Sequence, residues 1–196
     1  MTRSKIFQAT TLSLGLVLAA CGPKATTTNT VDASTTATTN DSMMTNDTAM
    51  TTAPSPTSAQ GFANAAAASD AFEIASSKLA ATKASSAKVK TFAAQMIAAH
   101  EKSTAKLKAT AATLSPAITP DPTLAPDQQA MLDTLQPLDG AAFDTAYVTN
   151  QTAAHQATLD KLKAYAANGE EPKFKEIATG LIPVVTAHLN MAKGLK

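Results

Sequence analysis

From residue 58 onward, apolar side chains recur at intervals of three and four, the spacing of one face of an α-helix. The pattern predicts four long helices, over 58–82, 86–114, 141–167 and from 172 to beyond 191, and no strand. We therefore expect one all-α domain over 58–196. The residues predicted to face its core are Phe62, Ala65, Phe72, Leu79, Val89, Phe92, Ala93, Met96, Leu107, Ala111, Leu114, Phe143, Tyr147, Val148, Leu159, Leu162, Phe174, Ile177, Leu181, Val184, Val185, Leu189 and Met191.

Prolines shape the connection between the second and third helices. Four of them between 115 and 126 forbid a continuous helix, and a short helix is expected over 127–136, followed by Pro137 and Gly140. Two hairpins joined by a long crossover predict a ferritin-like four-helix bundle, with a plain up-down bundle as the alternative. Asn168-Gly169 is expected to end the third helix, and Pro183 to kink the fourth.

The first 20 residues have the pattern of an export signal. Arg3 and Lys5 precede an apolar stretch over 6–20, which is too short to span a membrane. The stretch ends in Leu-Ala-Ala-Cys21-Gly22, which resembles a bacterial lipobox. We expect a lipoprotein signal peptide over 1–20 and an acylated Cys21, carrying palmitate-type chains that hold the protein on a membrane. An ordinary signal that leaves Cys21 as a free thiol is the alternative. By resemblance, Gly22 favours the outer membrane, facing the periplasm.

Residues 21–57 predict a tether. The segment is rich in Thr and Ala, has no aromatic residue and shows no apolar periodicity, so we expect it to be disordered. A coil of about 35 residues spans roughly 30–35 Å. Met43, Met44 and Met50 would suit a soft metal, but methionines incidental to a spacer are the preferred interpretation.

Composition excludes several classes of function. The 196 residues carry a net charge of +1 with unclustered basic groups, so no nucleic-acid partner is expected. A single Cys rules out an internal disulfide and a Cys-rich metal site. Aromatic residues make up 4%, which with the +1 charge argues against membrane binding by the domain itself. The predicted membrane contact is therefore the lipid alone.

The three histidines form the candidate site. His100, His155 and His188 each fall on the core side of a different predicted helix, and Glu73 borders the core stripe of the remaining one. Counting about 1.5 Å per residue from the hairpin turns places each of the four roughly 18–28 Å from its turn, near mid-height of helices about 40 Å long. We therefore expect one carboxylate and three imidazoles at a common level.

Two interpretations of this cluster stay open. One is a buried hydrogen-bonded network that fixes the register of an Ala-rich core. The other is a single transition-metal site, for which zinc, iron, manganese and copper all suit imidazole and carboxylate ligands. Four further residues lie one or two helical turns from a histidine and could support either arrangement: Met96 and Met191, and Tyr147 and Gln151, which could orient His155.

No complete catalytic set is present. Di-iron bundles use two Glu-x-x-His repeats, but the residues three before the histidines are Ile97, Thr152 and Val185. The only Cys belongs to the lipobox, and no Ser has a defensible His/Asp grouping. The sequence assigns no catalytic residue and favours a non-enzymatic protein.

Several segments, in order and spacing, resemble the bacterial family called domain of unknown function 4142. They are Phe72-Glu73-Ile74, Val89-Lys90-Thr91-Phe92-Ala93-Ala94-Gln95-Met96 with His100, Phe143-Asp144-Thr145-Ala146-Tyr147 with Gln151 and His155, and Leu181-Ile182-Pro183 with His188-Leu189. The resemblance covers 58–196. It implies a ferritin-like, exported outer-membrane protein of unestablished biochemical role, and it carries over Glu73, His100, His155 and His188. The family usually has Asp where this chain has Ala99, which is expected to remove a second carboxylate from the site.

Together these features predict a lipid-anchored periplasmic helical bundle that acts as a non-enzymatic envelope or stress-related binding module. The alternative is a mononuclear metal-binding or metal-dependent redox protein that uses Glu73 and the three histidines.

Overall fold

The computed structural model describes residues 53–195. Within that range the chain forms five helices, α1 (Ala59–Lys83), α2 (Ala87–Ala111), α3 (Pro126–Leu135), α4 (Gly140–Asn168) and α5 (Pro172–Lys193), and no strand. The all-α prediction is confirmed. None of these helices has both the length and the apolar character needed to cross a membrane. The predicted signal peptide, Cys21 and the tether up to residue 52 lie outside the described residues.

Local sequence explains where the helices begin. The hydroxyl of Ser58 accepts from the N–H of Gly61, and that of Ser86 from the N–H of Val89, so each serine caps a helix start. Prolines occupy the first position of α3 and α5, where a missing N–H costs nothing. The observed ends of the helices lie within about three residues of the predicted ones.

Two glycines shape the connections around α4. Gly140 begins the helix with a φ of 62°, a conformation that other residues rarely adopt. Gly169 ends it with an ordinary φ of −65°, and a Cβ at this position would collide with the ring of Tyr165. The predicted stop at Gly169 is confirmed, but the reason for glycine there is close packing.

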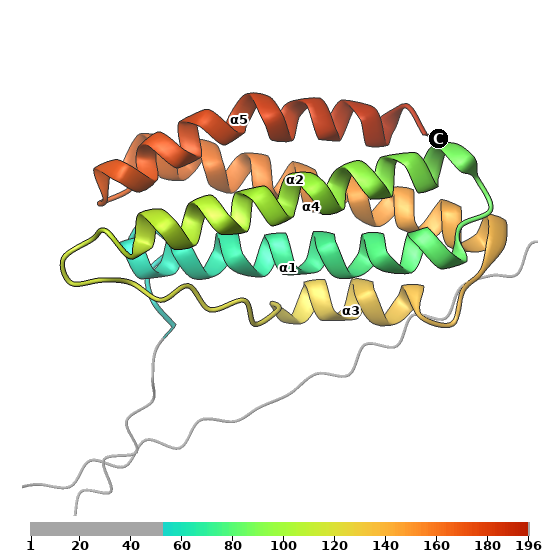
Figure 1. The fold of residues 1–196 in the computed structure, drawn as a ribbon, viewed down its shortest axis with the longest axis horizontal. Helices are drawn as coiled ribbons and strands as arrows, with labels where there is room; N and C mark the ends of the chain where they lie inside the picture. Colours follow the sequence, from blue (N-terminus) through green and yellow to red (C-terminus); the bar gives the residue numbers. More distant parts are fainter. Residues whose placement is uncertain (1–52, 196) are drawn as a thin grey trace, which may run out of the picture. The chain divides into compact units, whose positions relative to one another are not determined.

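Figure 1 shows the four long helices side by side, with α3 lying along the outside. Short turns join α1 to α2 and α4 to α5, and each pair packs closely. The crossover that contains α3 runs back along the molecule, so α4 begins at the end opposite to where α2 stops (Figure 1). Helix α1 also packs against α4, and α2 against α5, so the four long helices surround a common interior.

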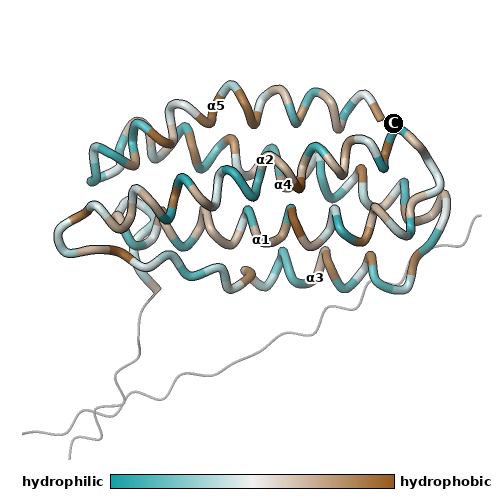
Figure 2. The backbone as a smooth tube through the Cα atoms, in the orientation of Figure 1, coloured by the Kyte–Doolittle hydropathy of each residue, from teal (hydrophilic) through white to brown (hydrophobic). Residues whose placement is uncertain are grey.

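Hydrophobic and hydrophilic positions alternate along the helices (Figure 2), and the buried apolar residues form two separate clusters. The Phe174 cluster consists of Phe62, Ala63, Ala67, Leu107, Ala111, Leu159, Leu162, Tyr165, Phe174, Ile177, Ala178, Val185 and Leu189. The Phe143 cluster consists of Ala80, Ala84, Val89, Phe92, Ala93, Met96, Leu135, Phe143, Tyr147, Val148 and Ala192. Along α1, α2 and α4, the buried residues between the two clusters are polar except for Ala68, Phe72 and Ala154.

Three predicted core positions are wrong. Ala65, Val184 and Met191 are exposed, the last two by 42% and 40%. Helix α5 packs mainly against α4 and to a smaller extent against α2, so a narrower stripe of it is covered than the apolar spacing implied. Helix α5 continues through Pro183 as an α-helix.

Candidate metal centre

A buried polar layer separates the two apolar clusters. We call it the middle layer, and it comprises Ser69, Asp70, Glu73, Ser76, Ser77, His100, Gln151, His155 and the partly buried His188. Four helices contribute to it, which explains why residues far apart in the sequence meet here. The predicted common level of Glu73 and the three histidines agrees with this arrangement.

The three imidazoles converge. The ring centroids lie 5.9 Å apart for His100 and His155, 5.8 Å for His100 and His188, and 5.5 Å for His155 and His188. One nitrogen from each ring lies within 4.8 Å of the other two. Because α2, α4 and α5 each supply one ring, the group exists only in the folded domain. We call these residues the His trio.

A carboxylate on α1 orients His100. The Nδ1 of His100 lies 2.8 Å from Oδ1 of Asp70, and the second oxygen of Asp70 accepts a hydrogen bond of 3.0 Å from the Thr104 hydroxyl. With Nδ1–H donating to Asp70, the neutral ring keeps its lone pair on Nε2. A carboxylate behind an imidazole is the usual arrangement around metal-binding histidines.

The backbone of α4 orients His155. Its Nδ1 donates to the carbonyl oxygen of Gln151, one turn earlier, at 2.9 Å. A carbonyl can only accept, so the hydrogen sits on Nδ1 and the lone pair of the neutral ring lies on Nε2. The Oε1 of Glu73 is 3.6 Å from the same Nδ1, too far for a good hydrogen bond. Gln151 was predicted to orient His155, and its main chain does so.

Every buried side-chain nitrogen or oxygen without a hydrogen-bond partner in residues 53–195 belongs to the middle layer. Native proteins leave few such atoms, and each needs an explanation. Three come from the His trio and two from neighbouring side chains: Nε2 of His100, Nε2 of His155, Nδ1 of His188, Oε2 of Glu73 and Oε1 of Gln151. Two of the unpartnered ring nitrogens are the Nε2 atoms of His100 and His155. These are the atoms that hold the lone pair when Nδ1 donates to Asp70 or to the Gln151 carbonyl.

Burial controls the charge of the layer. It raises the pKa of Glu73, which is 1% exposed, to about 7, although the nearby His100 partly opposes the shift. Burial lowers the pKa of His155 to about 4 despite its bond to Gln151, and lowers the pKa of His188 to about 4 with help from His100. Both rings are therefore neutral at pH 7 and have a lone pair to offer.

His100 behaves differently from the other two imidazoles. Burial lowers its pKa, but the hydrogen bond with Asp70 and the negative charges of Glu73 and Asp70 outweigh that effect, so that its pKa is raised. A ligand that needs the lone pair of His100 therefore competes with a proton near neutral pH.

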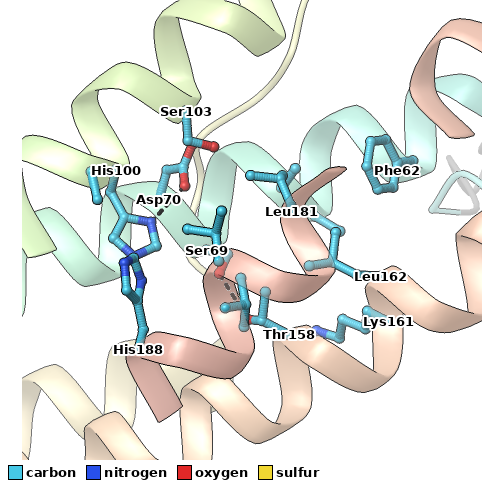
Figure 3. A pocket seen from close by; sticks show the side chains of 15 residues that line it. Phe62, Ser69, Asp70, His100, Ser103, Thr158, Lys161, Leu162, Leu181 and His188 are labelled. Carbon is cyan, nitrogen blue, oxygen red and sulfur yellow. Dashed lines mark hydrogen bonds and ion pairs between the residues drawn. The ribbon is translucent and has the colours of Figure 1, made fainter. Parts of the chain in front are cut away.

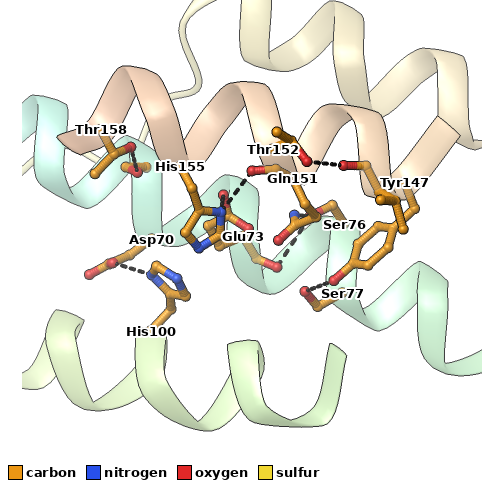
Figure 4. A network of polar contacts seen from close by, with 12 residues as sticks. Asp70, Glu73, Ser76, Ser77, His100, Tyr147, Gln151, Thr152, His155 and Thr158 are labelled. Carbon is orange, nitrogen blue, oxygen red and sulfur yellow. Dashed lines mark hydrogen bonds and ion pairs between the residues drawn. The ribbon is translucent and has the colours of Figure 1, made fainter. Parts of the chain in front are cut away.

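Around the His trio, further polar contacts hold α1 and α4 together (Figure 4). The Tyr147 hydroxyl lies 2.7 Å from Oγ of Ser77, and the side-chain amide of Gln151 donates to Oγ of Ser76 at 3.2 Å. Burial raises the pKa of Tyr147 beyond its usual range. The structure thus binds Tyr147 to Ser77, whereas the sequence pattern proposed it as a partner of His155.

The two methionines singled out from the sequence lie in different surroundings. Met96 is fully buried in the Phe143 cluster, one turn before His100. Met191 is exposed and lines a shallow surface hollow with Phe92 and Gln95. Neither methionine lines the pocket that contains His100 and His188.

Sequence reasoning missed Asp70 and Thr104. Ala99 was expected to remove a second carboxylate from the site. Position 99 has none, but α1 supplies Asp70 at hydrogen-bond distance from His100. Asp70 lies one turn before Glu73 on the same side of α1, so its spacing was the available signal. Thr104, one turn after His100, had no signal of its own.

Three imidazoles at such distances can act chemically as a ligand set, with His155 and His188 neutral at pH 7 and His100 giving up its proton on binding. Zinc and copper both accept imidazole, and catalytic zinc sites often combine three protein ligands with one open position. Thiolate ligands are absent from residues 53–195, and the carboxylates of Glu73 and Asp70 stand beside the rings.

Comparison with known proteins identifies the family. A family model described as "Domain of unknown function (DUF4142)" matches residues 43–195, and the chain belongs to this family. The predicted resemblance is confirmed, and the match begins inside the segment predicted as a tether. No curated protein matches the chain.

Among solved structures, the fold is similar to a protein named CopM in three metal-bound forms. The Cu(II)-bound form is 19% identical with a TM-score of 0.59, covering 70% of this chain and 94% of that one. The Ag-bound form is 20% identical with a TM-score of 0.58, covering 70% and 93%. The Cu(I)-bound form is 20% identical with a TM-score of 0.58, covering 69% and 92%. At this identity the likeness establishes a shared fold.

Proposed function

We propose that this domain binds a single transition-metal ion through His100, His155 and His188, with copper as the first metal to test. The observation that carries the proposal is the convergence of one nitrogen from each ring within 4.8 Å, together with a buried, unpartnered nitrogen on every ring. A bound cation would give all three atoms a partner at once. This is the alternative function inferred from the sequence, now preferred over the metal-free envelope module.

The structural-network interpretation has less support. In such a network the histidines should bond to one another or to Glu73, but in residues 53–195 the only histidine nitrogen within 4.0 Å of the Glu73 carboxylate is Nδ1 of His155, at 3.6 Å. A network that leaves polar atoms unsatisfied destabilises a core more than apolar residues would. Retaining three converging imidazoles is better explained by a ligand that compensates this cost.

Copper comes first for two reasons. Among divalent first-row ions, copper generally binds nitrogen sites most tightly. The similar CopM structures carry Cu(II), Ag and Cu(I), which makes the fold a reasonable host for such ions. Zinc, iron and manganese remain competitors in the same experiment. Glu73 borders the site as a carboxylate that could balance the charge of the ion.

We also propose the finer topology and location inferred from the sequence. The long crossover between α2 and α4 supports a ferritin-like four-helix bundle with an added short helix. The lipobox supports anchoring by lipid at Cys21, with the domain held in the periplasm at the outer membrane. Labelled palmitate should enter the protein in cells and fail to enter Cys21→Ser. Equal labelling of both would reject the anchor.

The direct test of the function is metal content. The tag-free chain, incubated with copper, zinc, iron and manganese together and then desalted, should retain about one equivalent of metal by mass spectrometry. His188→Ala should lose it, and this variant suits the test because His188 is only partly buried and its truncation disturbs the core least.

Met191→Leu is the matched control, because Met191 lies on the same helix and is exposed. It should retain the metal and distinguishes ligand loss from general damage to α5. A wild-type chain that retains no metal, or a His188→Ala variant that retains as much as wild type, would reject the proposal.

A further inference from the structure

One pocket reaches the His trio from the surface. It has a volume of about 70 Å³, and all four long helices contribute to its wall, with His100 and His188 among the lining residues. In Figure 3 the two imidazoles stand on one side, with Phe62 and Leu162 on the other. Three of the lining residues, Ala65, Lys161 and Val184, are exposed, so the pocket reaches solvent. We call it the trio pocket.

The wall of the trio pocket is almost entirely apolar. Its polar groups are the unpartnered ring nitrogens of His100 and His188, the side chains of Ser103 and of the exposed Lys161, and three groups that already have partners. Ser69 and Thr158 bond to each other through their hydroxyls at 3.0 Å. Both oxygens of Asp70 are taken, one by His100 and one by Thr104. A guest would therefore meet carbon atoms on most sides, which favours an uncharged molecule over an ion.

Size limits the guest further. Drug-sized ligands occupy pockets of about 300–1,000 Å³, and an engineered cavity of about 150 Å³ holds benzene. A pocket of about 70 Å³ suits a molecule of two or three atoms. Small residues create the space, since Ala66 on α1 and Ala99 on α2 stand where larger side chains would fill it.

We propose that the trio pocket binds a neutral diatomic molecule, of the class of dioxygen and carbon monoxide, and directs it to the open coordination position of the metal on the His trio. This inference rests on the proposed function, because the metal completes the site. Three imidazoles leave a coordination position for an exogenous ligand. Three other pockets within residues 53–195 have no residue of the His trio in their walls.

Carbon monoxide is the probe for the metal-bound chain. The full chain is loaded with Cu(I) under reducing conditions, its copper content is measured, and carbon monoxide is then added. Infrared spectroscopy should show one band from copper-bound carbon monoxide in proportion to the copper. Ala66→Leu should keep its copper and bind carbon monoxide about tenfold more weakly or worse, since the added side chain fills the pocket.

Ala81→Leu is the matched control. It makes the same change on the same helix at an exposed position outside the pocket, so it should bind carbon monoxide like wild type. If circular dichroism shows that Ala66→Leu is unfolded, Ala99→Val fills the pocket from α2.

Xenon tests the pocket without metal, because apolar cavities bind this atom. The ¹²⁹Xe NMR shift should depend on wild-type protein concentration and lose much of that dependence in Ala66→Leu. Copper bound without a carbon monoxide band would overturn the pocket proposal and leave the proposed function standing. Equal carbon monoxide or xenon binding in wild type and Ala66→Leu would also overturn it. A chain that binds no copper fails at the copper measurement, which rejects the proposed function and this inference together.

Discussion

The two apolar clusters and the middle layer are built from the same helices in opposite ways. The clusters bury Phe, Leu, Val, Ile, Ala, Met and Tyr, and none of the buried side-chain nitrogen or oxygen atoms that lack a hydrogen-bond partner in residues 53–195 belongs to them. The middle layer buries two carboxylates and two imidazoles, with His188 at its edge, and contains all five unpartnered atoms found in residues 53–195. The clusters therefore stabilise the fold, whereas the unpartnered polar atoms of the middle layer destabilise it.

This contrast indicates which part of the domain carries function. Proteins tolerate unfavourable local chemistry where a ligand or reaction needs it and compensate for it elsewhere. Here the compensation lies on both sides of the site, so the rings of the His trio are held between two packed clusters. Changes in the clusters should alter stability alone, whereas changes at the His trio and at Asp70, the partner of His100, should alter metal binding.

The largest effect is expected in the Phe174 cluster. Phe174→Ala removes a fully buried ring and should lower the free energy of unfolding by about 3–5 kcal/mol. Denaturant unfolding at low temperature measures the loss. The folded fraction should still bind metal with wild-type affinity, and Val184→Ala, at an exposed position on the same helix, should change stability by less than about 1 kcal/mol. Loss of metal affinity in folded Phe174→Ala would contradict the division between cluster and layer.

The second-largest effect is a change in the stability of the metal-free protein with pH, which Glu73 causes. Its pKa is about 7 in the folded chain, against an ordinary value of 4.5, so between these pH values the folded state keeps a proton that the unfolded state loses. The contribution of Glu73 to stability is therefore fully present below about pH 4.5 and falls as pH rises toward 7. Relative to wild type, Glu73→Gln should gain on the order of 2–3 kcal/mol across this range.

Unfolding free energies of wild type and Glu73→Gln, measured at several pH values, test this prediction. Taking the difference between the two removes the contribution of His155 and His188, whose lowered pKa makes stability rise with pH between about 4 and 6.5. A difference that does not change with pH would show that Glu73 titrates normally.

Asp70 should affect metal affinity more than stability. In Asp70→Asn the charged partner of His100 is replaced by an amide of the same shape, and loss of such a partner typically weakens metal binding about 10–100-fold. Competition with a chelator measures the change. Asp160→Asn, an exposed substitution on α4, is the control and should bind metal like wild type. Unchanged affinity in Asp70→Asn would remove Asp70 from the site.

The smallest effect is expected at Ser77, a residue of the middle layer that bonds to Tyr147. Ser77→Ala leaves the buried hydroxyl of Tyr147 without its partner and should cost about 1–2 kcal/mol of stability. Metal affinity should not change, because neither residue contacts the His trio through a hydrogen bond in the described structure. Thermal unfolding and chelator competition on the same sample would separate the two results, and a weaker metal complex would extend the site to Tyr147.

The sequence predicted the helices and the level of the site because both follow from spacing along single helices. Ser58 and Ser86 mark helix starts, and the rise per residue places Glu73 and the histidines at similar heights. Contacts between helices were harder to predict. Asp70 went unnoticed as the partner of His100, since which carboxylate meets which ring depends on how α1 is rotated against α2.

By itself, the sequence determined that the described part of this protein is helical, that polar residues interrupt its apolar faces at mid-height, and that its three histidines lie on three helices. Periodicity and rise are properties of one chain segment, so the amino-acid order suffices. Only the tertiary structure decided that the rings converge within 4.8 Å, that Asp70 orients one of them, that Met191 is exposed, and that a pocket of about 70 Å³ opens beside them. These features depend on the rotation and separation of packed helices, which side-chain packing across the whole core sets.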